Sequence, residues 1–126
     1  MRSPGHRQHP DHKVLEKHLD QRVTVEIGGQ VVADSRDVVE VDEDGSPPRY
    51  YFPRADVRMA DLSRSESTSQ CPYKGTAHYY SVRVGDRVLP DSVWTYEEPY
   101  DEHEGLANRL AFWPEKTPEI SIRRSS

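Results

Sequence analysis

Residues 76–84, Thr-Ala-His-Tyr-Tyr-Ser-Val-Arg-Val, carry the clearest secondary-structure signal in this sequence. Tyr80, Val82 and Val84 fall on one face of an extended chain, and the residues between them fall on the other. Such alternation is typical of a β-strand that buries one face. The dipeptide Gly85-Asp86 then turns the chain back on itself. We therefore expect an antiparallel sheet around this strand.

The same pattern recurs through most of the chain. Val23, Val25 and Ile27 alternate with polar residues, and Gly28-Gly29 supplies the positive φ angles of a tight hairpin turn. Further strands are predicted at residues 21–27, 30–35, 38–41, 49–52, 63–70, 92–97, 110–113 and 120–122, with 63–70 as an exposed edge strand. Eight or nine short strands, with a turn every eight to twelve residues, predict a mainly β, antiparallel domain that is sandwich-like or barrel-like.

One short helix is predicted near the N-terminus, between residues 11 and 20. Val14, Leu15, His18 and Leu19 share one face of a helix drawn through this stretch. About ten residues is too short for a helix to be stable alone, so we expect packing to hold it in place.

The length of 126 residues and the mass of 14.5 kDa fit a single domain. We expect this domain to span residues 11–123, with one helical turn at 56–62 and an irregular acidic segment at 98–105. Residues 1–10 are polar and contain basic residues and proline, a composition that predicts a flexible arm. Residues 124–126 are expected to form a short tail.

Composition narrows the classes of function. Hydrophobic residues make up only 33% of the chain, so the seven Tyr and two Trp must supply much of the core. A net charge of −5 argues against a nucleic-acid partner, and no apolar run approaches the roughly 20 residues of a membrane span. The start lacks the apolar stretch of a secretory signal, so we expect a cytoplasmic protein. Cys71 is the only cysteine, which excludes an intramolecular disulfide and a paired-cysteine zinc site.

The pentapeptide Cys71-Pro72-Tyr73-Lys74-Gly75 is the densest candidate for chemistry. A thiol is nucleophilic as the thiolate, which a nearby ammonium favours, and a turn that reverses at Gly75 would bring Lys74 close to Cys71. The alternative is a structural cysteine at a strand end beside a solvated lysine.

Glu40 and Arg49 are candidates for different reasons. Glu40 has apolar neighbours in sequence, so burial would raise its pKa toward that of a general base; ordinary alternation would instead leave it in water. Arg49 flanks the aromatic run Tyr50-Tyr51-Phe52, which suits a flat anionic ligand, although core packing explains the run equally well.

Two groups of residues have metal-ligand chemistry. The first group is an imidazole-rich stretch that consists of His6, His9, His12 and His18. The second group, Asp42, Glu43 and Asp44, offers hard oxygen ligands but lacks EF-hand spacing and a phosphate-binding glycine loop. The histidines lie mostly in the stretch expected to be flexible, so we expect no metal and no cofactor.

Several motifs occur in the order of a known family. They are Val32-Ala33-Asp34-Ser35, Glu40, Tyr50-Tyr51-Phe52-Pro53, Cys71-Pro72-Tyr73-Lys74-Gly75, Trp94-Thr95-Tyr96 with Pro99, and Leu110-Ala111-Phe112. Over about residues 23–112 the chain resembles the domain-of-unknown-function family numbered 427, also catalogued as nucleotidyltransferase-like. The resemblance implies a small antiparallel β-tent, in which two sheets splay from a common edge with a groove between them. It also implies that one groove is lined or supported by Glu40, Tyr51, Cys71, Lys74, Tyr79, Trp94 and Tyr96.

These observations predict a domain that binds a small, anionic ligand in a groove between its sheets. The candidate catalytic residues are Cys71, Lys74 and Glu40, and the candidate ligand-binding residues are Arg49, Tyr51, Tyr79, Trp94 and Tyr96. The sequence does not decide whether the domain is an enzyme.

Two alternatives stay open. The first is a protein-interaction or self-assembly module, a homo-oligomer included, that uses aromatic residues near Trp94 and Trp113. The second is nucleotidyl transfer, as the catalogue name suggests. Such enzymes place a carboxylate pair after a Gly-Gly or Gly-Ser turn to hold two metals, and no such pair follows Gly28-Gly29.

Overall fold

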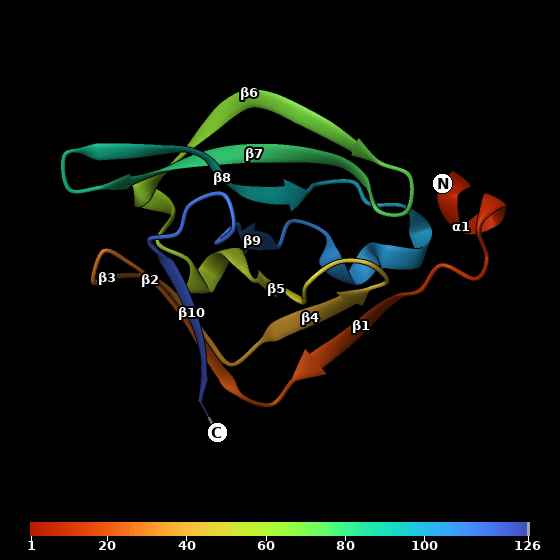
Figure 1. Cartoon of the computed structure of the whole chain (residues 1–126), viewed down its shortest axis with the longest axis horizontal. Coiled ribbons are helices and arrows are strands. Elements are labelled where there is room, and N and C mark those ends of the chain that lie inside the picture. The colour runs from red at the N-terminus through yellow and green to blue at the C-terminus, as the bar shows by residue number, and fades with distance from the viewer. Residues whose placement is uncertain (126) are drawn as a thin grey trace.

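The computed structural model describes residues 1–125 as ten strands in two antiparallel sheets (Figure 1). The larger sheet contains β1 (Val14–Leu19), β4 (Val38–Glu43), β5 (Arg49–Phe52), β6 (Leu62–Cys71), β7 (Gly75–Val84), β8 (Arg87–Tyr96) and β9 (Leu110–Phe112). Its spatial order is β1-β4-β5-β9-β8-β7-β6. The smaller sheet contains β2 (Arg22–Ile27), β3 (Gln30–Ser35) and β10 (Ile120–Ser125), in the order β10-β2-β3. The predicted mainly β, two-sheet fold is confirmed.

Two local features of the predicted sheet are also confirmed. Gly28 and Gly29 adopt φ angles of 58° and 85° in the turn that joins β2 to β3. The Ser-rich strand β6 forms one edge of the larger sheet, as its polar sequence predicts.

Strand β8 is longer than the sequence indicates. The sequence predicts a strand that begins at Ser92, whereas in the structure one strand runs from Arg87 to Tyr96 with a register shift. Asp91, with a positive φ of 50°, lies at this irregularity, where Tyr80 pairs with Val93 but Val82 pairs with Leu89. A bulge absorbs the extra residues and the strand continues past it.

The helix predicted over residues 11–20 is wrong, because this stretch forms strand β1. Val14 and Leu19 are its only buried residues, and Leu15, which the helical face would bury, is 60% exposed. β1 pairs with β4 along its whole length and so satisfies backbone groups at that side of the larger sheet. A ten-residue helix offers no comparable set of tertiary hydrogen bonds and is marginal alone.

The short N-terminal helix lies instead in the stretch where we expect a flexible arm. Helix α1 (Pro4–Gln8) starts at the N-cap Ser3, whose side chain accepts a hydrogen bond from the amide of His6 at 3.1 Å. Ser3 and Gly5 are buried, so this stretch packs against the domain in the structure. At the other end, Arg124 and Ser125 of the expected tail belong to β10, and Ser126 lies outside the described residues.

Three 3₁₀ helices complete the described chain: η1 (Arg54–Asp56), η2 (Met59–Asp61) and η3 (Asp101–Leu106). The first two replace the predicted helical turn at 56–62, and η3 replaces most of the predicted irregular acidic segment. Within residues 1–125 no helix is both long and apolar enough to cross a membrane.

Buried hydrophobic residues form two clusters, because the larger sheet buries side chains on both of its faces. The inter-sheet core joins both sheets and includes Val23, Val25 and Ile27 of β2, Phe52 of β5, Val82 of β7 and Phe112 of β9. The pocket-side core lies on the other face of the larger sheet and includes Val39, Val41, Tyr51, Trp94, Tyr96, Leu106 and Ala111. Figure 1 shows this sheet strongly bent, with β6, β7 and β8 above β4 and β1. The second core occupies the inside of this bend.

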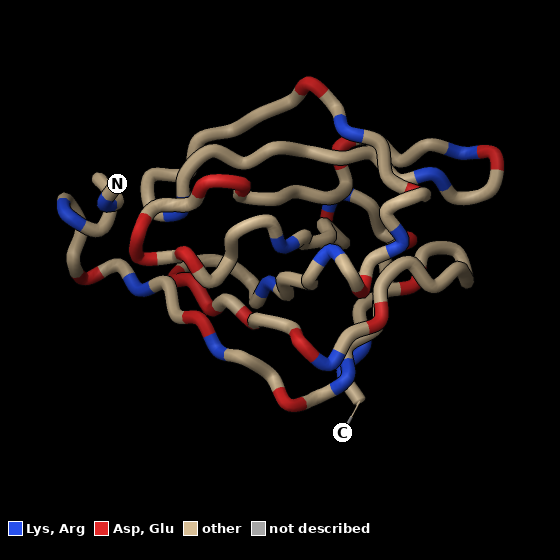
Figure 2. Tube along the Cα trace, turned by 180° about the vertical axis from the view of Figure 1, so that it is seen from behind, with Lys and Arg blue, Asp and Glu red and all other residues tan. Residues whose placement is uncertain are grey.

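Charged residues are intermixed along the whole trace (Figure 2). Many of them form ion pairs between different segments of the chain, such as Arg22 with Asp34 at 2.6 Å and Arg87 with Glu119 at 2.8 Å. These pairs are largely exposed, so each contributes little to stability. A function that depends on charge must therefore come from a local grouping of side chains.

Candidate functional site

A pocket of about 190 Å³ opens on the pocket-side face of the larger sheet. It is lined by Val41, Glu43, Ser46, Arg49, Tyr51, Lys74, Tyr79, Trp94, Tyr96 and Trp113. The expected groove between the two sheets is instead filled by the inter-sheet core. The site therefore lies within the bend of one sheet.

Six residues predicted from the sequence meet in this pocket. They are Arg49, Tyr51, Lys74, Tyr79, Trp94 and Tyr96. Five of them lie on β5, β7 and β8, where alternate residues of a strand point to the same face of the sheet, and Lys74 lies in the turn between β6 and β7. Arg49 and Tyr51 follow this rule on β5, and Trp94 and Tyr96 follow it on β8.

Lys74 is the central polar residue of the pocket. It lies in the turn between β6 and β7 and is only 6% exposed. Gly75 follows with a φ of 121°, which favours glycine, and the carbonyl of Lys74 accepts a hydrogen bond from the amide of Tyr100 at 2.9 Å. The predicted turn at the CPYKG motif thus exists and holds the Lys74 ammonium in the pocket-side core.

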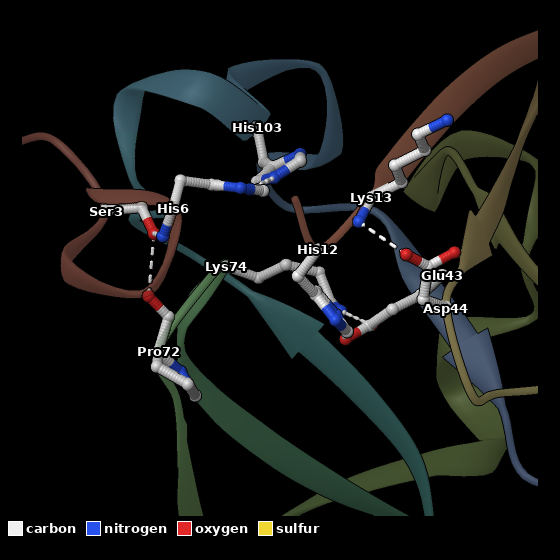
Figure 3. A network of polar contacts seen from close by, with 9 residues as sticks. All are labelled: Ser3, His6, His12, Lys13, Glu43, Asp44, Pro72, Lys74 and His103. Carbon is white, nitrogen blue, oxygen red and sulfur yellow. Dashed lines mark hydrogen bonds and ion pairs between the residues drawn. The ribbon is translucent and has the colours of Figure 1, made fainter. Parts of the chain in front are cut away.

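Glu43 is the carboxylate beside Lys74. The Lys74 Nζ donates to Glu43 Oε1 at 2.5 Å, and His12 Nε2 lies 3.0 Å from Glu43 Oε2 (Figure 3). Burial acts to raise the pKa of Glu43, but the hydrogen bonds from Lys74 and His12 outweigh it and hold this pKa below its usual value. Glu43 is therefore ionised at neutral pH.

Glu40 lies on the other face of β4 from the pocket. Val39, Val41 and Glu43 share the pocket-side face of this strand, so Glu40, one residue out of phase, points away from it. Its carboxylate accepts a hydrogen bond from Arg124 of β10 at 3.1 Å. Glu40 is buried, as the apolar neighbours suggest, but the structure does not bring it to Lys74.

Cys71 ends β6 and pairs in register with Gly75. It is half-buried and packs against the pocket-side core, but it does not line the pocket. Of the three residues predicted for chemistry, only Lys74 faces the cavity.

The walls of the pocket are aromatic and held in place by polar contacts. Trp94 Nε1 donates to the Tyr51 hydroxyl at 3.0 Å, and the Arg49 guanidinium lies 5.5 Å from the centroid of the Trp94 ring. Arg49 also donates to Glu115 outside the pocket at 2.6 Å. Burial raises the pKa of both Tyr51 and Tyr96, so their hydroxyls stay protonated. The charged residues that line the pocket are therefore the cations Arg49 and Lys74 and the carboxylate Glu43.

Sequence reasoning missed two important lining residues, Glu43 and Trp113. From the sequence, Glu43 is a candidate only as a metal ligand, and Trp113 only as part of an interaction surface. Extending the predicted strand 38–41 by two residues would have placed Glu43 on the face of Val39 and Val41. In the described part of the chain, no three His, Cys, Asp or Glu side chains are grouped so that they could hold a metal ion.

A protein-family model described as "Domain of unknown function (DUF427)" matches residues 16–122. The chain belongs to the DUF427 family. The resemblance predicted from the motifs is thereby confirmed, and the match extends beyond the expected 23–112 at both ends. Every pocket-lining residue of this DUF427 domain falls within the match, whereas His6 and His12 precede it. A search of the curated proteins found no match for the chain.

Proposed function

We propose that this DUF427 domain binds a small, flat, anionic ligand in the pocket, with Lys74 as its main cationic group. The observation that carries the proposal is the environment of Lys74. An ammonium has three donors, and the described structure gives the Lys74 side chain one hydrogen-bond partner, Glu43. The remaining donors of this buried group are available to an oxyanion in the pocket, and such charge-assisted hydrogen bonds are strong.

The other walls favour an anion over a cation. Aromatic side chains can enclose a cation, but Arg49 already lies over the Trp94 ring. The charged lining residues are Arg49, Lys74 and Glu43, so together they carry a net charge of +1. Neutral Tyr51 and Tyr96 add polar hydroxyls without adding negative charge.

The size of the pocket sets the size of the ligand. A cavity of roughly 150 Å³ can hold one benzene molecule, and drug-sized ligands occupy pockets of about 300–1,000 Å³. The volume of 190 Å³ thus suits a ligand with about one ring and one acidic group. A whole nucleotide is larger than this, so nucleotidyl transfer gains no support from the pocket.

The self-assembly alternative also gains little support. It requires a flat, exposed aromatic patch, whereas Trp94 is buried and Trp113 is half-buried at the pocket. The large hydrophobic residues that are exposed within strands, Leu15, Val31 and Val88, belong to three different strands. If the pocket catalyses a reaction, Lys74 and Glu43 are the residues placed to take part in it.

Benzoate is a suitable probe, with benzamide as the uncharged ligand of the same shape. We expect benzoate to raise the melting temperature of the domain and benzamide to do so much less. A ligand at 100 times its Kd adds about 2.7 kcal/mol to the free energy of unfolding.

The variant Lys74→Met tests the assignment. It should weaken benzoate binding in isothermal titration calorimetry at least ten-fold, whereas Lys17→Met, at an exposed position of β1, should leave the affinity unchanged. Equal affinity for benzoate and benzamide, or equal binding by the wild-type and Lys74→Met domains, would refute an anion site at Lys74.

A further inference from the structure

The N-terminal segment, residues 3–12, docks onto the turn that carries Lys74. The Ser3 hydroxyl and the Gly5 amide both donate to the carbonyl of Pro72, at 2.7 and 2.9 Å. Gly5 fits closely, because a Cβ atom there would lie 2.7 Å from the same carbonyl oxygen and 2.8 Å from the Tyr73 ring. The segment thus contacts the two residues that precede Lys74 in the chain.

Two imidazoles, which Figure 3 shows, and the carboxylate of Glu16 hold the segment on its other side. His6 Nε2 lies 2.9 Å from His103 Nε2, and His103 Nδ1 lies 2.6 Å from Glu16 Oε2. The Glu16 carboxylate can only accept, so His103 donates from Nδ1 and its Nε2 accepts from His6. The three residues come from α1, η3 and β1, so the contact joins segments that are distant in sequence.

This arrangement limits the number of protons that the histidine pair can hold. A hydrogen bond between two Nε2 atoms requires a proton on one and a lone pair on the other. If both rings are protonated, two N–H groups and two positive charges face each other, and the contact is lost. The docked segment is therefore compatible with at most one added proton on the pair.

The far end of the segment contacts a lining residue of the pocket. His12 stacks on Tyr73, with ring centroids 4.2 Å apart, and contacts the Glu43 carboxylate that holds Lys74. Release of the segment would remove one of the two side-chain partners of Glu43. Glu43 would then compete more strongly with a ligand for the Lys74 ammonium.

We propose that residues 3–12 form a pH-sensitive clasp, which the shared proton of His6 and His103 keeps closed and which opens when both rings are protonated. The clasp lies before residue 16, where the DUF427 match begins. Its effect on the pocket rests on the proposed function, but its opening does not.

The groups around His6 agree with opening on the acid side of neutral pH. Burial and the facing His103 lower the pKa of His6 from its usual 6.5; His12 also lowers it, whereas Glu102 and Glu43 raise it. Because the pKa of His6 is lower in the docked state, docking is fully stabilised above pH 6.5. It weakens as the pH falls through the pKa that His6 has in the docked state. Tyr73, in edge contact with His6, completes its surroundings.

The test measures the order of the segment without a ligand. We would record backbone ¹⁵N heteronuclear NOEs for Gly5, His6 and Arg7 between pH 8 and pH 5, with circular dichroism to verify that the sheets stay folded. The wild-type segment should be as rigid as the strands at pH 8 and mobile at pH 5. In His6→Gln and His103→Gln the rigidity should no longer depend on pH. His9→Gln, an exposed control in the same segment, should keep the wild-type midpoint.

Two results would overturn the clasp: a wild-type segment that stays rigid at pH 5, or variants of His6 and His103 that retain the wild-type midpoint. Benzenesulfonate, which stays ionised over this range, then tests the link to the pocket. We expect its affinity to fall between pH 8 and pH 5 in the wild-type domain but not in His103→Gln. Absence of benzenesulfonate binding would count against the proposed function and the link to the pocket, and the NOE result would still decide whether the clasp exists.

Discussion

At the scale of single residues, the Lys74–Glu43 pair controls the character of the pocket. Both charges are largely removed from water, with side-chain exposures of 8% and 18%, and each is the strongest partner that the other has. Removal of one partner leaves a poorly solvated charge, whereas removal of both leaves an apolar site. The pair is therefore open to a direct energetic test.

Glu43→Gln should lower the free energy of unfolding by about 1–3 kcal/mol, because the Lys74 ammonium loses its counter-charge. Urea denaturation at pH 7 measures this change. The double variant Glu43→Gln/Lys74→Met should recover most of the loss. As a matched control, Glu115→Gln removes the half-exposed partner of Arg49 and should cost less than about 1 kcal/mol. A double variant no more stable than Glu43→Gln would contradict this account.

At the scale of secondary-structure elements, the sequence was sufficient where local pattern and tertiary contacts agree. The alternating residues of β7 and the Gly28-Gly29 hairpin are examples, as is the polar edge strand β6. It was insufficient for β1, because a six-residue stretch has little preference of its own and its pairing with β4 decides its conformation.

Tertiary pairing also explains why the sequence predicted only part of the candidate site. Motif order and aromatic content identified six lining residues, but the choice between Glu40 and Glu43 depends on which face of β4 meets the pocket. That face is fixed by the register of β4 against β1 and β5. The partnership of His6 with His103 could not be predicted either, since it joins residues 97 positions apart.

The docking of α1 gives a prediction at this scale. Gly5→Ala should displace the N-terminal segment, because the added methyl group meets the Pro72 carbonyl and the Tyr73 ring at under 3 Å. Hydrogen exchange at the amides of residues 5–9 should become at least ten-fold faster, while exchange in β7 and β8 stays unchanged. Gln8→Ala, at an exposed position of the same helix, is the control. Unchanged protection in Gly5→Ala would contradict the tight fit.

At the scale of the whole molecule, the larger sheet separates two cores that have different tasks. Tyr51 and Phe52 are adjacent in β5 but belong to different cores, Tyr51 to the pocket-side core and Phe52 to the inter-sheet core. Phe52→Ala should therefore destabilise the fold by about 3–5 kcal/mol. Chemical denaturation measures this loss. Benzoate affinity of the folded fraction should stay near that of the wild type, and a large loss of affinity would mean that the two cores are coupled.

Acid stability is also a property of the whole molecule. Hydrogen bonds from Arg22, His18 and Arg64 lower the pKa values of Asp34, Asp37 and Glu97, respectively, as those from Lys74 and His12 do for Glu43. Carboxyl groups with lowered pKa values stabilise the fold above their unfolded-state values, near 4, and lose this contribution as the pH falls through the folded-state values. The urea midpoint should therefore fall between pH 5 and pH 2.5, chiefly through the half-buried Glu43, because the other three carboxylates lie in more exposed pairs. The drop should be smaller in Glu43→Gln, and an identical drop would exclude a contribution from Glu43.

The chain has two tryptophans, and both of them line the pocket. Its tryptophan fluorescence therefore originates entirely from the walls of the cavity. Any compound that enters it, or any displacement of Arg49 or Lys116 from the indole faces, should change the emission spectrum without an attached dye. The domain thus carries its own optical reporter, and large collections of metabolites can be screened by reading fluorescence from the unlabelled protein.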